Sequence, residues 1–258
     1  MDITEIISQL GTLGLGRFPI AAIEAARANR AAVVPSFLEV IEACRAPDAT
    51  RQTLDTGFFI FHLLGEWREK WAYRSLARLL RCPGYELDAL LGDAITTTIH
   101  RVMAAVFDGD PQPICDIVLD PQADEFVRSR MCETLAILVL RGELDSSLVT
   151  RFLRDAYSKL QPQAECYVWQ GWQSAIAMLG LRELETLVRR AFARGFINRH
   201  WLGFENFRRD LQSAIKEPGE PQQPGDDKFT LFGNTVEELS GWFGLSRDYR
   251  AGRQTKRE

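Results

Sequence analysis

The sequence contains no uninterrupted apolar run of about 18 residues, the length that a membrane-spanning helix requires. Its first ten residues, MDITEIISQL, include two acidic residues and no basic one, unlike the basic start of a secretory signal. The 258 residues carry a net charge of −4 and are 46% apolar, which is typical of a globular protein with a sizeable core. We therefore expect a soluble cytoplasmic protein that does not associate with a membrane.

Cysteine is scarce and irregularly spaced. Zinc sites usually take closely spaced cysteine pairs, and small secreted disulfide frameworks usually contain an even number of cysteines. The five cysteines of this chain include no C-x-x-C pair; they are Cys44, Cys82, Cys115, Cys132 and Cys166. We expect these thiols to be small hydrophobic residues in a reducing compartment, with no bound metal.

Motifs for catalysis and cofactor binding are also missing. The three histidines show no metal-binding spacing, and no G-x-S-x-G motif is present. The stretch GTLGLG (11–16) lacks the order of a phosphate-binding loop, and the DGD triplet (108–110) lacks EF-hand spacing. Glu66 lies one helical turn after His62, and Asp93 lies on the same helix side as His100. Such a pair could form a general base or half a metal site, but a structural role is the favoured interpretation. We expect no cofactor, and a protein that is not an enzyme.

Most of the chain has the periodicity of amphipathic helices. Apolar residues recur at steps of three and four within 93–108, 124–141 and 165–179. The run FFIFHLL (58–64) resembles a strand in composition, but it continues into EWREK without a turn residue. We interpret this run as a helix that is buried on most sides. The sequence therefore predicts an all-α protein.

Glycines at the ends of the longer predicted helices indicate an internal repeat. Gly65, Gly109, Gly142 and Gly180 are separated by 44, 33 and 38 residues, within the range of two-helix solenoid repeats. The predicted pairs are 50–66 with 71–81, 93–108 with 111–120, 124–141 with 147–160, and 165–179 with 182–195, preceded by helices near 2–10, 19–29 and 34–45 and closed by one near 204–216. Because one pair cannot bury its own apolar face, we predict a HEAT-like α-α superhelix, a right-handed solenoid of antiparallel helix pairs.

The composition changes after Lys216. The stretch EPGEPQQPGDD (217–227) contains three prolines and no other apolar side chain, which is typical of a linker. We therefore predict a helical-repeat domain over 1–217, a Pro/Gly linker over 218–228 and a C-terminal segment over 229–258. Within that segment Asn234 is expected to cap a short amphipathic helix, and the last twelve residues form a basic tail.

Four strings of this sequence resemble one bacterial family. They are FHLLGEWREKWAYRSLARLLR (61–81), LLGDAITTTIHRVMAAVFDGD (90–110), DPQADEFVRSRMCETLAILVLRGEL (120–144) and LVRRAFARGFINRHWLGFENFRRDL (187–211). Together they are similar to domain of unknown function 1186 over about residues 1–217; the resemblance implies a helical-repeat fold and implies no activity. Some members carry a C-terminal Cys-rich zinc motif, but the chain after Pro224 has no cysteine, so a zinc-borne partner contact is not expected.

Charge divides unequally between the two helices of each predicted pair. The four second helices carry a net charge of +5 and the four first helices carry −3. If the second helices line the concave face, as in HEAT arrays, that face is basic and attracts an acidic protein surface. Basic side chains that only solvate an exposed face are the alternative. The residues predicted to contact a partner are Arg74, Arg78, Arg81, Arg151, Arg154, Arg189, Arg190, Trp67 and Trp71. The preferred function is a scaffold or adaptor that binds an acidic protein.

Two enzymatic alternatives would use the same scaffold. A DNA glycosylase-like enzyme would form a cleft from Trp67, Trp71 and Asp93, but residues 1–246 carry a charge of −7, which disfavours a nucleic-acid partner. A bilin-lyase-like enzyme has only an analogy of fold in its favour. The pairs Trp67 and Trp71, and Trp169 and Trp172, have helical spacing, for which core packing is favoured over an aromatic-walled groove.

Overall fold

The computed structural model describes residues 1–12, 18–219 and 230–242, and within these ranges the chain is helical with no strand. The α-helices are α1 (Ile3–Leu10), α2 (Ile20–Ala28), α3 (Arg30–Ala43), α4 (Arg51–Glu66), α5 (Tyr73–Leu79), α6 (Gly84–Leu91), α7 (Ala94–Thr97), α8 (Ile99–Ala105), α9 (Gln112–Leu119), α10 (Glu125–Leu140), α11 (Ser146–Lys159), α12 (Val168–Met178), α13 (Glu185–Ala193), α14 (Phe204–Lys216) and α15 (Thr235–Leu239). Two 3-10 helices, η2 (Lys70–Ala72) and η3 (Arg182–Leu184), precede α5 and α13. The protein is therefore all-α, as predicted. None of the described helices is both long enough and apolar enough to cross a bilayer.

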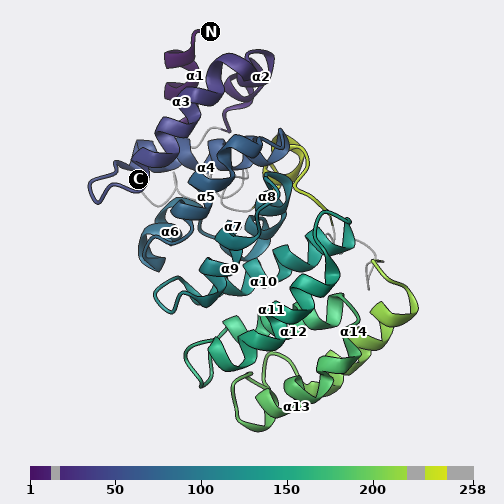
Figure 1. Ribbon diagram of the computed structural model, residues 1–258. Coiled ribbons are helices and arrows are strands. Elements are labelled where there is room, and N and C mark those ends of the chain that lie inside the picture. Colours follow the sequence, from purple (N-terminus) through teal and green to yellow (C-terminus); the bar gives the residue numbers. More distant parts are fainter. Residues whose placement is uncertain (13–17, 220–229, 243–258) are drawn as a thin grey trace.

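The helices follow one another along the long axis of the molecule, from α1–α3 at one end to α13 at the other (Figure 1). One continuous row of packed helices runs through the molecule: α4 packs on α8, α8 on α10, α10 on α12, and α12 on α14. We call these five helices the central row. Each of the first four members is followed in sequence by a helix outside the row, α5, α9, α11 and α13 in turn, and α5 also packs on α9.

The core lies along the central row. Every residue of α8 is buried, as are residues 55–65 of α4. Two glycines allow these helices to approach closely. A Cβ on Gly65 of α4 would meet the Val102 side chain of α8, and a Cβ on Gly171 of α12 would lie 2.0 Å from the backbone oxygen of Ser129 in α10. Small residues at these positions are therefore needed for packing, because a side chain would force the helices apart.

The predicted turn chemistry is mostly confirmed. Gly109, Gly142 and Gly180 adopt φ angles of 108°, 72° and 64°, the left-handed region that glycine enters without strain. Asp124 caps α10, since its carboxylate accepts hydrogen bonds from two backbone amides of the first turn. Helix α4 ends at Glu66, as predicted for 50–66, but Gly65 is not among the left-handed glycines and instead serves helix packing.

Several predicted boundaries also need correction. The predicted helix 93–108 is divided at Thr98 into α7 and α8, because the hydroxyls of Thr96 and Thr97 donate to the backbone carbonyl of Asp93 one turn earlier. The predicted helix 71–81 begins as the 3-10 helix η2 and ends at Leu79. Helix α6, which starts directly after Pro83, was not predicted at all.

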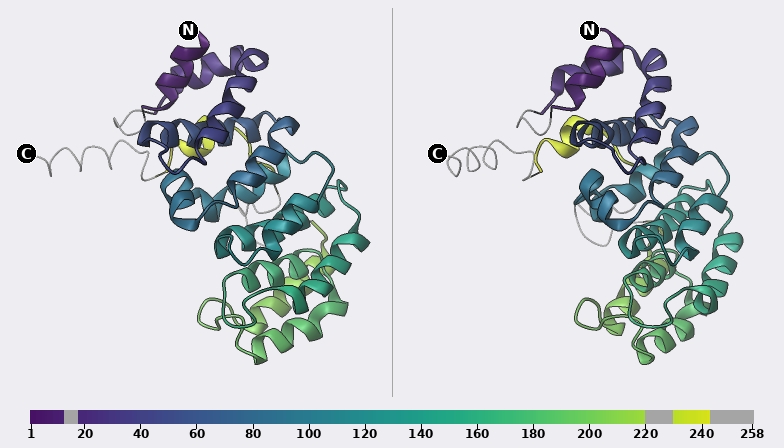
Figure 2. Two further views of the ribbon diagram at one scale, coloured as in Figure 1. Left: turned by 60° about the vertical axis from the view of Figure 1, so that its left-hand side comes forward. Right: turned by 90° about the vertical axis from the view of Figure 1, so that its left-hand side faces the viewer.

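The C-terminal segment returns to the first half of the molecule. In both views of Figure 2 the yellow segment lies among the blue helices of the first half, away from the green helices that precede it in sequence. Helix α15 packs on α4, and Asn234 caps it as predicted, accepting hydrogen bonds from the backbone amides of Val236 and Glu237. Residues 220–229 and 243–258, which include most of the predicted linker, the basic tail and Phe243, lie outside the described residues.

Candidate functional site

Arg74 and Arg78 of α5 and Arg81 in the turn after it are paired with carboxylates from other helices or turns. The pairs are Arg74 with Asp108 and Asp110, Arg78 with Glu42, and Arg81 with Asp120. The three arginine side chains nevertheless remain 57%, 52% and 48% exposed. Each guanidinium has five N–H donors, so these pairs leave donors available for a further acceptor.

The remaining arginines of the predicted set lie on α11 and α13. Arg151, Arg154 and Arg190 are exposed. Arg189 pairs with Glu185 at 3.1 Å, and its guanidinium lies 4.9 Å from the centre of the Phe204 ring. Among the second helices of the predicted pairs, the acidic helix α9 comes between α5 and α11 in the chain. The predicted basic residues therefore form two groups, one on α5 and the turn after it and one on α11 and α13.

The two tryptophans of the predicted contact set have opposite surroundings. Trp67 is only 9% exposed and stacks on Phe37 of α3, with ring centroids 5.8 Å apart. Trp71 in η2 is 84% exposed. The prediction of core packing is therefore wrong for Trp71, because the chain leaves the α-helical path at Arg68, whose φ is 53°, and the two rings no longer share a helical face.

The other tryptophan pair matches the prediction of core packing. Trp169 and Trp172 are fully buried, and each indole N–H donates to a backbone carbonyl, of Pro162 and Leu153 respectively. Asp93, the third residue of the alternative nucleic-acid cleft, is exposed in the turn before α7.

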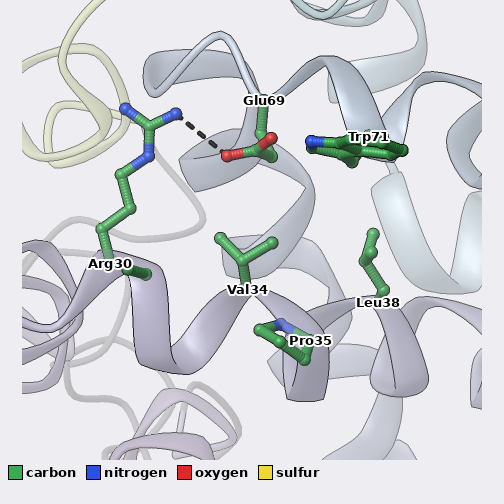
Figure 3. A pocket seen from close by; sticks show the side chains of 7 residues that line it. Arg30, Val34, Pro35, Leu38, Glu69 and Trp71 are labelled. Carbon is green, nitrogen blue, oxygen red and sulfur yellow. Dashed lines mark hydrogen bonds and ion pairs between the residues drawn. The ribbon is translucent and has the colours of Figure 1, made fainter.

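A groove of about 590 Å³ lies beside Trp71, between α3 and the segment that contains η2. Figure 3 shows Val34 and Leu38 pointing from α3 toward Glu69 and Trp71. Arg30 and Glu69 form an ion pair of 2.9 Å on one side of the groove. Its lining residues are Arg30, Ala31, Val34, Pro35, Leu38, Glu69 and Trp71. The groove is therefore mainly apolar, with one charged pair and one exposed indole at its edge.

Sequence reasoning missed the α3 side of this groove. The helix was predicted to begin near residue 34, but it begins at Arg30, which leaves Arg30 and Ala31 outside the prediction. Val34 and Leu38 are one helical turn apart, are half-buried, and lie beside the fully buried positions Val33, Phe37 and Ile41. A second apolar stripe on one helix is the signal that could have found this surface.

His62 has the structural role that was predicted. It is buried, with Nδ1 at 2.7 Å from the carbonyl oxygen of Phe58 and Nε2 at 2.8 Å from Oγ1 of Thr98. Because a carbonyl only accepts, Nδ1 carries the proton and the Thr98 hydroxyl donates to Nε2. Burial lowers the pKa of His62 to about 4. The carboxylate one turn away, Glu66, pairs with Arg27.

The cysteines lie in apolar surroundings. Cys44, Cys115 and Cys132 are buried, and Cys82 and Cys166 are half-buried. Burial raises the pKa of Cys44 and of Cys115 to about 12, so these thiols stay protonated and unreactive near neutral pH. Within the described ranges, no three His, Cys, Asp or Glu side chains are grouped as metal ligands.

The C-terminal segment sits on a polar and aromatic surface that sequence reasoning did not find. Arg101 of α8 is 5% exposed and donates hydrogen bonds to the backbone oxygens of Thr230 and Leu231 and to both carboxylate oxygens of Glu238. These partners are at least 129 residues apart in sequence, so no local spacing could reveal them.

A second polar contact fixes the start of α15. Glu66 of α4 accepts a hydrogen bond from the backbone amide of Thr235 at 2.7 Å, and Arg27 donates to the side chain of Asn234 at 3.0 Å. Arg27 also donates to both carboxylate oxygens of Glu66. Burial alone would raise the pKa of Glu66, but the hydrogen bonds from Arg27 and Thr235 lower it, so Glu66 stays ionised.

The family described as "Protein of unknown function (DUF1186)" matches residues 1–246 of this chain. The chain belongs to this family. The resemblance stated from four sequence strings is therefore confirmed, and the match extends beyond residue 217 into the C-terminal segment that packs on α4.

Two Chlamydia proteins are similar to this chain over almost their whole length. Uncharacterized proteins of Chlamydia muridarum (strain MoPn / Nigg) and Chlamydia trachomatis serovar D are each 24% identical over 252 residues. The alignments cover 94% of this chain and 97% and 96% of the two relatives. No solved structure matches this chain.

Proposed function

We propose that this protein is a HEAT-like helical-repeat scaffold that binds a protein partner. Several ion pairs between helices or the turns beside them support the repeat, because they join residues 34 to 39 positions apart, close to the intervals between the predicted helix ends. Examples are Arg27 with Glu66, Arg74 with Asp108, and Arg81 with Asp120. Equivalent contacts at one repeat interval are expected where each pair stacks on the next.

The packing favours the central row as the inner side of a curved array, since helices on the inner side lie closest together. The second helices, which carry the arginines of the predicted contact set, then belong to the outer side. This assignment differs from the concave basic face inferred from the sequence. The α5 arginines are partly neutralised by ion pairs, so we assign the main attraction for a partner to the groove beside Trp71.

The observation that carries this proposal is the exposure of Trp71 at the edge of an apolar groove. Tryptophan is among the residues that contribute most to protein interfaces, and a contact surface of this kind gains free energy when water is removed from it. Arg74 and Arg78 of α5 follow Trp71 at steps of three and four along the chain. The partner therefore presents an apolar side chain to the groove and carboxylates to the half-exposed guanidiniums.

A peptide-display selection on the full-length protein tests this proposal. We expect the enriched peptides to combine an apolar anchor residue with Asp or Glu, and to lose at least about tenfold in affinity when Trp71 is replaced by alanine. Trp201→Ala is the matched control, because Trp201 is also exposed, at 58%, but lies beside Tyr167. Peptides that bind the wild type and Trp71→Ala equally well would contradict the proposed groove.

The arginines provide an independent arm of the same experiment. Arg74→Glu should weaken the selected peptides by about tenfold at low salt, with a smaller effect at high salt because the attraction is screened. If Arg74→Glu leaves the affinity unchanged at all salt concentrations, the partner's acidic character is refuted while the groove itself is not.

A further inference from the structure

We propose that residues 230–242 occupy a peptide-binding surface formed by α2, α4 and α8, and that this surface also accepts a segment of another protein with the same pattern. The pattern is an aromatic residue followed six positions later by a carboxylate, as in Phe232 and Glu238. We call this the C-terminal docking surface. It uses other residues than the groove beside Trp71, so the inference goes beyond the function proposed above.

The first argument is the polar character of the contact at Arg101. A segment that only extended the core would be expected to meet an apolar surface. Here the guanidinium of Arg101, which is 5% exposed, donates hydrogen bonds to two backbone carbonyls and one carboxylate of the segment. A replacing segment must supply acceptors at the same places, because buried donors that lose their acceptors are costly. The contact with Arg101 therefore favours segments that carry a carboxylate at the position of Glu238 over segments that do not.

The second argument is the recognition of a helix start. Glu66 accepts the backbone amide of Thr235, the first residue of α15, and Arg27 donates to the capping residue Asn234. The amide contact is made to the backbone and so does not depend on the side chain at position 235. The surface thus offers an acceptor to the first turn of an incoming helix, where backbone amides lack partners.

The third argument is an aromatic pocket. Phe232 is buried, with its ring centre 5.0 Å from that of His62 and 5.8 Å from the Arg101 guanidinium. Trp242 lies against Phe58 at 6.3 Å between ring centres. An aromatic side chain that lies against an imidazole ring and faces a cation gains more than an aliphatic one, which explains the requirement for an aromatic residue.

The segment depends on this surface for its helix. Helix α15 has five residues, and a helix this short is not stable by itself in water. Its folding is therefore coupled to docking, as in peptides that fold when they bind. Because the segment belongs to the same chain, its local concentration is on the order of millimolar, and a second protein must compete with it.

A binding experiment with the full-length protein tests the proposal. The probe is a fluorescent peptide of residues 230–242, TLFGNTVEELSGW, and the receptors are the wild type, Glu238→Arg and the control Glu237→Arg. Glu238 contacts Arg101, whereas its neighbour Glu237 is exposed. Hydrogen exchange at the amide of Phe232, which donates to the carbonyl of Arg101, reports whether the protein's own segment is docked.

We expect Glu238→Arg to expose the Phe232 amide and to bind the peptide at least about tenfold more tightly than the wild type, with Glu237→Arg behaving as the wild type. A peptide that carries arginine at the position of Glu238 should not bind. Glu238→Gln keeps the shape of the side chain and provides the same comparison if the arginine variant does not fold.

Three outcomes would overturn the inference. Equal peptide binding by all receptors would show that the peptide binds elsewhere. A segment that stays protected in both Glu238 variants would show that the carboxylate does not hold it. If the segment is released and peptide binding does not increase, the surface does not bind a segment of another molecule.

Discussion

Replacing Gly171 by alanine is expected to destabilise the protein, although alanine is normally the better residue inside a helix. A Cβ at this position would lie 2.0 Å from the backbone oxygen of Ser129 and 2.5 Å from its carbonyl carbon and Cα. Real Cβ atoms are essentially never closer than 3.0 Å to such atoms. Helices α10 and α12 would therefore have to move apart by about an ångström or more, since backbone atoms cannot rotate out of the way.

The size of the effect follows from two opposing contributions. The change from glycine to alanine gains about 1 kcal/mol in a helix interior. Overpacking costs about 1 to 3 kcal/mol when side chains can adjust, and more is expected where two backbones meet. We expect a net loss of about 2 kcal/mol in the free energy of unfolding. For a chain of this size that lowers Tm by about 4 to 8 °C.

Thermal and urea unfolding followed by circular dichroism measure this loss, and two other glycines serve as controls. A Cβ on Gly65 would meet only the Val102 side chain, at 2.9 Å, which can shift, so Gly65→Ala should cost less than Gly171→Ala. A Cβ on Gly241 would have no neighbour within 4 Å, and Gly241→Ala should leave Tm almost unchanged. A Gly171→Ala protein as stable as the wild type would refute the close approach of α10 and α12.

Two further predictions concern buried side chains. The pKa of His62 is lowered from its ordinary value of 6.5 to about 4 in the folded protein, so the unfolded chain binds more protons between these values. The contribution of His62 to the free energy of unfolding is complete above about pH 6.5, and about 3 kcal/mol of it is lost as the pH falls toward 4. Urea unfolding at several pH values in this range should show this decrease for the wild type and not for His62→Gln. Trp172→Ala should cost about 3 to 5 kcal/mol because the residue is fully buried, whereas Trp71→Ala should change stability by less than about 0.5 kcal/mol; equal losses in thermal unfolding would contradict the exposure of Trp71.

Much of the helical architecture could be predicted because local patterns determine it. Apolar steps of three and four located α10 and α12, and Asp124, Gly142 and Gly180 marked where helices begin and end. These signals act within one or two turns, so a single sequence contains them. Helix α6 was not predicted, although proline directly before a helix is compatible with its start.

The candidate site was predicted less well because it depends on which side of a helix is covered. Trp67 and Trp71 look equivalent at a spacing of four, yet one is buried against α3 and the other is exposed, owing to the single left-handed residue Arg68. Arg74, Arg78 and Arg81 were expected on one helix, and the structure places the first two on α5 and the third in the turn after it. Their carboxylate partners lie more than 30 residues away and could not be assigned from spacing.

The sequence by itself determined that this chain forms helices, where most of them begin and end, and to which family it belongs. Those properties depend on interactions between near neighbours along the chain and on patterns shared with relatives. Only the tertiary structure decided that Gly65 serves packing, that Trp71 is presented beside a groove, and that residues 230–242 return to Arg27, Glu66 and Arg101. Each of these depends on contacts between distant parts of the chain, and such contacts leave no periodic signal in the sequence.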